Sequence, residues 1–376
     1  MATNFSSVPM LDYSLVSAAS TRAAFVCSLQ SALTTTGFFY LTSHPVPAEL
    51  VASVAAYAPR FFAELPEEEK QRIRMVESPH FFGYTGFGTE WTKGRVDQRE
   101  QFDFGTECEE RAGEGVVPAY KRLWGPSQWP EEGLLPGFRT TLASYIAQVS
   151  QLGDELMVLV AEALGLPADA FSKFTEERGN VHRGKIIKYP VGADSDQGVG
   201  PHFDGGFLTL LLQASEHRGL QVQNLGGEWI DAPPVPGTFV VNIGKALEAV
   251  TQGVAIATSH RVLSPASGAR YSIPFFQMIA QDVVIGKSVL AMPVEMLALR
   301  DARGKVASDC EPSYHVLWRV LMKRAAVNYA EYGELAAGQV MLIGRIKSHP
   351  DVGQRHYPQL FHQLFPDGLP AHGSAY

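Results

Sequence analysis

The chain has 376 residues and a mass of 41.0 kDa, enough for one large domain or two smaller ones. Hydrophobic residues make up 45% of it, a proportion that is typical of a folded protein and excludes extensive disorder. The net charge of −8 argues against a nucleic-acid binder, which usually presents a basic surface. No apolar run reaches the roughly 18 residues of a membrane span, so we expect no membrane partner.

Cysteine usage and the N-terminus favour the cytoplasm. Cys27, Cys108 and Cys310 are odd in number and far apart, so we expect reduced thiols rather than a disulfide framework. Residues 1–10 lack the basic and apolar segments of a secretory signal. These properties suit a cytoplasmic enzyme without selecting one.

The first zone, residues 8–130, mixes short strands and helices. Its apolar spacing predicts an extended entry at 8–12, a helix at 20–33, a strand at 38–41 and helices at 49–62 and 66–70. The last of these helices has a proline in its first turn and acidic residues near its positive end.

The second zone, residues 131–180, is dominated by a long amphipathic helix. From Phe138 onward, apolar residues recur close to the 3.6-residue period, and Gly165 and Pro167 mark the end of the pattern. We expect this helix to cover a sheet.

The third zone, residues 181–285, is rich in short strands. We predict strands at 184–189, 202–212, 220–224, 228–231, 238–243, 255–263 and 270–278. Many short strands at regular spacing indicate a sandwich or jelly roll. A helical extension follows at 286–376, with a helix at 312–332. No linker is evident, so residues 1–376 are expected to form a single catalytic unit.

A candidate metal site lies in this β-rich zone. His202 and Asp204 are two residues apart in a predicted strand, so their side chains are expected to share a face. His260, in a later predicted strand, can supply a third ligand. Two histidines and one carboxylate form the ligand set of non-haem Fe(II) oxygenases.

The spacing alone is weak evidence, because the chain contains a second match at His349-Pro350-Asp351. Pro350 cannot donate to a sheet ladder, and no strand-like run with a basic anchor follows. We therefore interpret this second match as a surface loop.

Arg270 and Ser272 follow His260 in another predicted strand and share a face. A guanidinium beside a hydroxyl can hold a carboxylate through charge-assisted hydrogen bonds. The apolar residues around the pair would keep it dry and strengthen the interaction. The order of the motifs favours this carboxylate anchor over a surface ion pair.

These motifs resemble the isopenicillin N synthase-like family of Fe(II)/2-oxoglutarate-dependent dioxygenases, most of all its fungal members. The resemblance covers roughly residues 8–285. Its main pieces are Tyr189-Pro190, His202-x-Asp204, Gly219-Leu-Gln-Val-Gln223, Gly227-Glu-Trp-Ile230, Asn242-Ile-Gly244, His260-Arg-Val262 and Arg270-x-Ser272. The first zone resembles the leading region of that family.

The resemblance implies a mainly β core with surrounding helices, namely a distorted double-stranded β-helix (a cupin-like jelly roll) with an α/β N-terminal region. It implies His202, Asp204 and His260 as Fe(II) ligands. Arg270, Ser272 and Tyr189 would bind the distal carboxylate of 2-oxoglutarate. The implied reaction uses O2, releases succinate and CO2, and oxidises a small molecule, plausibly in specialised metabolism.

The chain departs from the family pattern in places. Ile187 stands where many relatives have asparagine, which removes one polar contact to the cosubstrate. Lys245 stands where plant members often carry aspartate. None of these positions is a metal ligand.

The substrate pocket is harder to predict. If Tyr189 points inward, Lys185 shares its face, and we hypothesise that Lys185 pairs with an acidic group of substrate or cosubstrate. A lysine that reaches solvent is the alternative. Phe207 and Phe276 are candidates for the pocket wall or the core, and Tyr84 for its mouth.

Two other functions stay open. One is an Fe(II) oxidase of the same family that does not use 2-oxoglutarate, and Ile187 favours it slightly. The other is a non-catalytic binding protein on the same scaffold, which the intact ligand and anchor residues disfavour. Reaction outcome, substrate and oligomeric state are not predicted.

Overall fold

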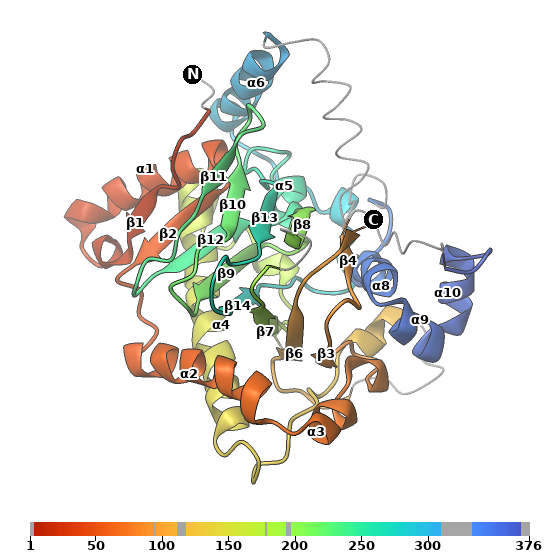
Figure 1. The fold of residues 1–376 in the computed structure, drawn as a ribbon. Helices are drawn as coiled ribbons and strands as arrows, with labels where there is room; N and C mark the ends of the chain where they lie inside the picture. Colours follow the sequence, from red (N-terminus) through yellow and green to blue (C-terminus); the bar gives the residue numbers. More distant parts are fainter. Residues whose placement is uncertain are drawn as a thin grey trace.

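Two sheets form the core of the protein (Figure 1). The computed structural model describes residues 4–92, 95–110, 118–176, 179–192, 197–309 and 333–369. The strands of the eight-stranded sheet are, in spatial order, β1 (Met10–Asp12), β2 (Phe38–Thr42), β12 (Phe239–Ile243), β9 (Leu208–Gln213), β14 (Arg270–Phe276), β7 (Arg183–Tyr189), β6 (Glu100–Gly105) and β3 (Gly83–Thr85). The strands of the four-stranded sheet are β11 (Trp229–Asp231), β10 (Leu220–Gln223), β13 (His260–Leu263) and β8 (Gln197–His202).

The first zone supplies strands to the large sheet. β2 pairs with β12, and β6 pairs with β7, so the N-terminal strands flank those of the third zone in one sheet. A separate two-stranded ribbon, β4 (Trp91–Thr92) with β5 (Arg95–Val96), precedes β6. The boundaries predicted at residues 130, 180 and 285 stay predictions.

Each strand of the large sheet sends alternate side chains to opposite faces. Phe102, Ile186 and Ile273 pack on one face against three helices, α1 (Ala19–Thr35), α2 (Ala48–Glu64) and α4 (Phe138–Ala163). Ile187, Tyr189 and other residues on the opposite face pack against the four-stranded sheet. The face between the sheets is the interior of the jelly roll, and the functional side chains lie there.

The predicted long helix is confirmed as α4, whose inner side is continuously buried. The other α-helices of the described residues are α3 (Glu67–Arg72), α5 (Lys245–Val250), α6 (Val294–Asp309), α8 (Ala337–Ser348), α9 (Pro350–His356) and α10 (Pro358–Leu364). The helix predicted at 312–332 lies outside the described residues. Within the described ranges, no helix is long and apolar enough to cross a membrane.

Two strand predictions need correction. The predicted strand 202–212 is two strands, β8 and β9, because residues 203–207 form a turn bound to the start of α5. Gly244 N donates to Phe207 O at 2.8 Å, and Lys245 N donates to Asp204 O at 2.7 Å. The predicted strand 255–263 begins only at His260, since Ile256 N bonds to Leu33 O of α1 instead of a strand.

Candidate active site

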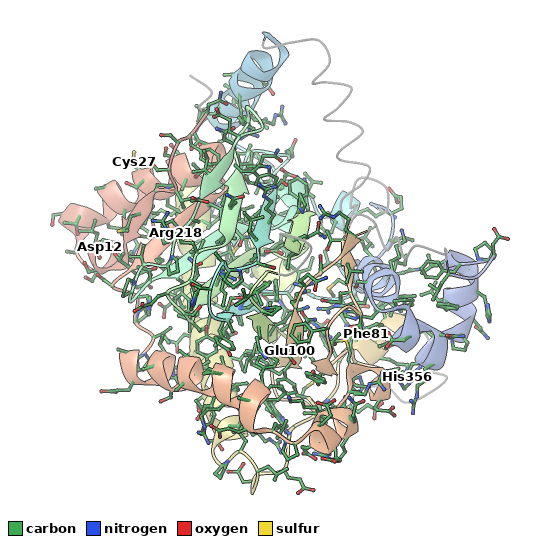
Figure 2. The ribbon with its side chains drawn as sticks, in the orientation of Figure 1. Asp12, Cys27, Phe81, Glu100, Arg218 and His356 are labelled. Carbon is green, nitrogen blue, oxygen red and sulfur yellow. The ribbon has the colours of Figure 1, made fainter. Side chains whose placement is uncertain are left out.

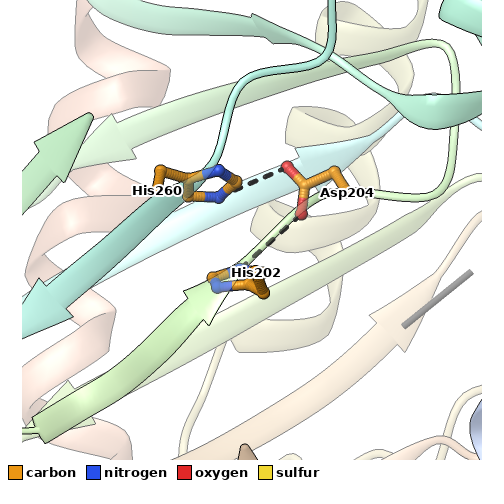
Figure 3. Close-up of side chains that lie close together, drawn as sticks. All are labelled: His202, Asp204 and His260. Carbon is orange, nitrogen blue, oxygen red and sulfur yellow. Dashed lines mark ion pairs between the residues drawn. The ribbon is translucent and has the colours of Figure 1, made fainter. Parts of the chain in front are cut away.

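The candidate metal ligands converge at one end of the four-stranded sheet (Figure 3). His202 ends β8 and His260 begins β13, and the two residues pair directly across the strands. Asp204 lies in the turn after β8, so it approaches the histidines from a loop and not from a strand face. Asp204 is therefore near the two histidines because of this turn, and not because His202 and Asp204 share one face of a strand, as the sequence had indicated.

The ligand atoms are close enough to share one ion. Asp204 Oδ1 lies 3.9 Å from His202 Nε2, and Asp204 Oδ2 lies 3.8 Å from His260 Nε2. Metal bonds of about 2.0–2.2 Å keep two ligands of one ion within roughly 4.4 Å of each other. Both separations therefore fit a single shared metal.

The backbone fixes the tautomer of both histidines. His202 Nδ1 lies 2.8 Å from Gly200 O, and His260 Nδ1 lies 3.3 Å from Thr258 O. A carbonyl only accepts, so each Nδ1 carries the proton and each Nε2 keeps its lone pair for a metal. The donor set therefore fits a divalent transition metal.

Two neutral donors hold the Asp204 carboxylate. Thr209 Oγ1 donates to Oδ2 at 2.6 Å, and Asn242 Nδ2 donates to the same atom at 2.8 Å. Burial alone would raise the pKa of Asp204, but the facing imidazoles of His260 and His202 and these hydrogen bonds outweigh it, so the pKa lies below its usual value. Asp204 is thus a charged ligand.

His202 is held neutral. Burial, together with the neighbouring His260, lowers the pKa of His202 to about 3. Its imidazole is therefore available as a ligand at neutral pH without first losing a proton.

Arg270 lies on the interior face of β14 and is 1% exposed. Its Nη2 donates to Gln213 Oε1 at 3.0 Å, but among the described residues Nε and Nη1 have no hydrogen-bond partner. Its guanidinium lies 5.1 Å from the ring centre of Tyr189, which pairs with it across the strands. Ser272, also buried, follows on the same face. A buried guanidinium with two nitrogens that lack a partner among the described residues, on the sheet that faces the candidate metal ligands, fits an anionic cosubstrate.

Lys185 shares the interior face with Tyr189, as alternation predicted, and contacts protein carboxylates there. Its Nζ lies 3.5 Å from Asp103 Oδ1 and 3.9 Å from Glu90 Oε1. Lys188, on the opposite face, has its Nζ 2.7 Å from Glu100 Oε1. Figure 2 labels Glu100. A substrate role for Lys185 stays a prediction.

Core packing accounts for two of the aromatic candidates. Phe207 makes edge contacts with Phe171 and Phe174, at ring distances of 5.7 and 5.1 Å. Tyr84 lies in the helix-side core and donates to Glu100 Oε2 at 2.8 Å. Phe276, which is partly buried, shares the interior face with Arg270. Their assignment to a substrate pocket stays a prediction.

The surface-loop interpretation of the second His-x-Asp is wrong for His349. This residue joins α8 to α9 and is 4% exposed, and its Nε2 lies 2.9 Å from Glu90 Oε1. Asp351 is exposed in the first turn of α9. His349 is buried because α8 packs against the body of the protein. Local sequence patterns do not predict this packing.

Sequence reasoning missed Thr209, Asn242 and Gln213. Alternation would have placed Thr209 and Gln213 on the interior face of β9. Asn242 is a polar residue inside the apolar run of β12, a pattern that signals a specific partner.

A jelly-roll core with two histidines, one carboxylate and an adjacent buried arginine defines the class of non-haem Fe(II) oxygenases. Residues 8–132 match the family described as the N-terminal region of non-haem dioxygenase in morphine synthesis, and residues 180–279 match the 2OG-Fe(II) oxygenase superfamily. The chain therefore belongs to the Fe(II)/2-oxoglutarate-dependent dioxygenases. This family uses Fe(II), 2-oxoglutarate and O2.

Relatives agree over most of the chain. The 2-oxoglutarate-dependent dioxygenase frbJ of Dothideomycetidae sp. is 41% identical over 370 residues, 95% of this chain and 94% of that protein. A homoarginine-6-hydroxylase of Glycine max is 37% identical over 76% of this chain and 89% of its own. The crystal structure of a Neurospora crassa protein in complex with alpha-KG and thymine has a TM-score of 0.62 at 26% identity, covering 73% of this chain and 87% of that one. The names of these relatives favour a 2-oxoglutarate-dependent enzyme over the two alternatives.

Proposed function

We propose that His202, Asp204 and His260 hold the Fe(II), and that Arg270, Ser272 and Tyr189 bind the distal carboxylate of 2-oxoglutarate. The observation that carries this proposal is the buried guanidinium of Arg270 on the sheet that faces the ligand group, two of whose nitrogens have no partner among the described residues. A buried cation without an anion is costly, so a dicarboxylate cosubstrate explains its presence.

The side chains of this chain prepare the site in distinct ways. Thr209 and Asn242 orient Asp204, the backbone carbonyls fix the imidazole tautomers, and Gln213 fixes the Arg270 fork. When bound, Fe(II) and 2-oxoglutarate supply the oxidising chemistry, in which O2 yields succinate, CO2 and an oxidised substrate. The protein supplies geometry and exclusion of water.

We propose that the substrate is a small polar molecule that becomes hydroxylated. The support comes from relatives: homoarginine-6-hydroxylases are similar over three quarters of the chain, and the Neurospora crassa structure contains thymine. The net charge of −8 and the free thiols of Cys27 and Cys108 support a cytoplasmic reaction without nucleic acid.

The earlier hypothesis for Lys185 is tested by the substrate KM of Lys185→Ala. A clear increase supports contact with an acidic substrate group, and an unchanged KM contradicts it.

Succinate formation tests the proposed function. Purified protein with Fe(II), 2-oxoglutarate and O2 is expected to release succinate slowly alone and faster with substrate. Omitting Fe(II) is expected to stop it. An oxidase that dispenses with 2-oxoglutarate would consume O2 without forming succinate, and that result would contradict the proposal.

A further inference from the structure

Arg99 and Arg270 lie on opposite sides of Tyr189 on the same face of the large sheet. The β6–β7 pairing sets Glu100 opposite Lys188, so one residue further it sets Arg99 beside Tyr189. On the other side of β7, Tyr189 pairs with Arg270. Alternation puts the Arg99, Tyr189 and Arg270 side chains on the interior face of the jelly roll. Two guanidinium groups therefore flank Tyr189.

Arg99 is also close to the strand that carries the metal ligand His202. Gln98 N donates to Gln197 O of β8 at 3.1 Å. Asp97 Oδ1 accepts from Gly200 N at 3.3 Å, and the carbonyl of Gly200 orients the His202 imidazole. Of the two arginines, Arg99 is thus linked to the iron-ligand strand.

Two carboxylates contact the Nη2 group of Arg99. Arg99 Nη2 lies 2.7 Å from Glu90 Oε2 and 3.4 Å from Asp97 Oδ2. Among the described residues, its buried Nε has no hydrogen-bond partner. The Arg99 side chain is 14% exposed, so it is held in place by the carboxylates but is still partly accessible to a ligand. The carboxylates therefore hold Nη2, while Nε, on the same edge of the guanidinium, has no partner among the described residues.

Glu90, one of these two carboxylates, also contacts other basic side chains. Glu90 also contacts His349 and lies 3.9 Å from Lys185. Burial would lower the pKa of Arg99, but Glu90 and Asp97 outweigh it and raise the pKa, so the guanidinium stays charged. These contacts hold the charged guanidinium of Arg99 in a fixed position, on the side of Tyr189 that is nearer to the His202 strand.

We infer that Arg99 binds a carboxylate held beside the iron. The inference rests on the proposed function, because it presumes iron and 2-oxoglutarate in this site. The carboxylate has two possible sources, the 1-carboxylate of 2-oxoglutarate and an acid group of the organic substrate. A planar fork suits either carboxylate.

Binding of 2-oxoglutarate to Mn(II)-loaded protein, measured by calorimetry, tests the first source. If Arg99 holds the 1-carboxylate, Arg99→Gln weakens 2-oxoglutarate binding at least about tenfold, as loss of a charged hydrogen bond does. Mn(II) affinity without 2-oxoglutarate stays unchanged. Arg95→Gln, an exposed control four residues earlier, keeps wild-type affinity.

Proton relaxation of acetate tests the second source. In protein loaded with Mn(II) and 2-oxoglutarate, the methyl protons of acetate are expected to relax faster than those of uncharged acetamide. If Arg99 takes a substrate acid, Arg99→Gln loses this excess and Arg95→Gln keeps it.

The inference is overturned if Arg99→Gln retains wild-type affinity for 2-oxoglutarate and acetate shows no Arg99-dependent excess. It is also overturned if Mn(II) affinity falls as much as 2-oxoglutarate affinity, because Arg99 would then act only through the His202 strand.

Should Arg99→Gln not fold, Arg99→Lys, which keeps the charge and loses the planar guanidinium, is measured in the same way. Arg270→Gln separates the two proposals: if it leaves 2-oxoglutarate affinity unchanged, the proposed cosubstrate site itself is wrong.

Discussion

Asp204 is the ligand whose position depends most on its neighbours. It lies in a turn, and its Oδ2 accepts hydrogen bonds from Thr209 and Asn242 of two adjacent strands. Such outer contacts hold a metal ligand in its binding orientation, and their loss commonly weakens metal binding 10–100-fold.

Thr209→Val removes one of these donors while keeping the shape of the side chain. We expect Fe(II) or Mn(II) affinity to fall about tenfold or more, measured by calorimetry. Thr238→Val is the control, because the hydroxyl of Thr238 donates to Val235 O and not to Asp204. Equal affinity in both variants would contradict the role of Thr209.

Residue types and their order predicted the candidate ligands and the Arg270 anchor, but not their supports. His202, Asp204, His260 and Arg270 follow the family motifs along the chain. Glu90 and His349 meet only because α8 packs against the body, over a separation of more than 250 residues that local patterns do not encode. Asp103 meets Lys185 through the pairing of β6 with β7, which local sequence patterns do not encode either.

At the scale of elements, the turn at 203–207 and the start of α5 act as one unit. Ala246 N donates to Gly205 O and Gly206 O, in addition to the bonds from Gly244 and Lys245. The apolar run after Phe207 made 202–212 resemble one strand. The backbone instead satisfies its hydrogen bonds with α5, which the sequence of the turn alone does not indicate.

Gly244→Ala is expected to disturb this unit. A Cβ at Gly244 would lie 2.1 Å from Gly206 O, a backbone atom that cannot move without shifting the turn that carries Asp204. We expect a loss of stability of about 1–3 kcal/mol and weaker metal binding, measured by thermal unfolding and calorimetry. Gly133→Ala, with no atom within 4 Å of its Cβ, serves as the control. Unchanged metal affinity in Gly244→Ala would contradict this coupling.

At the scale of the whole molecule, the large sheet separates two environments. Its helix-side face holds the main apolar core together with the Lys188–Glu100 ion pair, while its inner face carries the buried polar side chains of the site. His182, the residue before β7, is buried against Phe275 and accepts from Met278 N at 3.0 Å through Nδ1. This bond requires a neutral imidazole.

Acid is expected to destabilise the fold through His182. Burial lowers its pKa from 6.5 to about 4, so between these values the unfolded chain binds a proton that the folded chain does not. The free energy of unfolding therefore falls as pH decreases through this range, by up to roughly 3 kcal/mol. Urea unfolding of the apoprotein from pH 7 to 5 and an NMR titration of His182 measure it. Titration of folded His182 near 6.5 would contradict the prediction.

The two His-x-Asp motifs of the chain give the most direct measurement of the central claim, that His202, Asp204 and His260 form the iron site. Calorimetry with Mn(II) compares Asp204→Ala with Asp351→Ala, an exposed aspartate in the same sequence pattern. We predict that Asp204→Ala loses metal binding and 2-oxoglutarate turnover, while Asp351→Ala retains both. Wild-type metal affinity in Asp204→Ala, or equal losses in the two variants, would contradict the account.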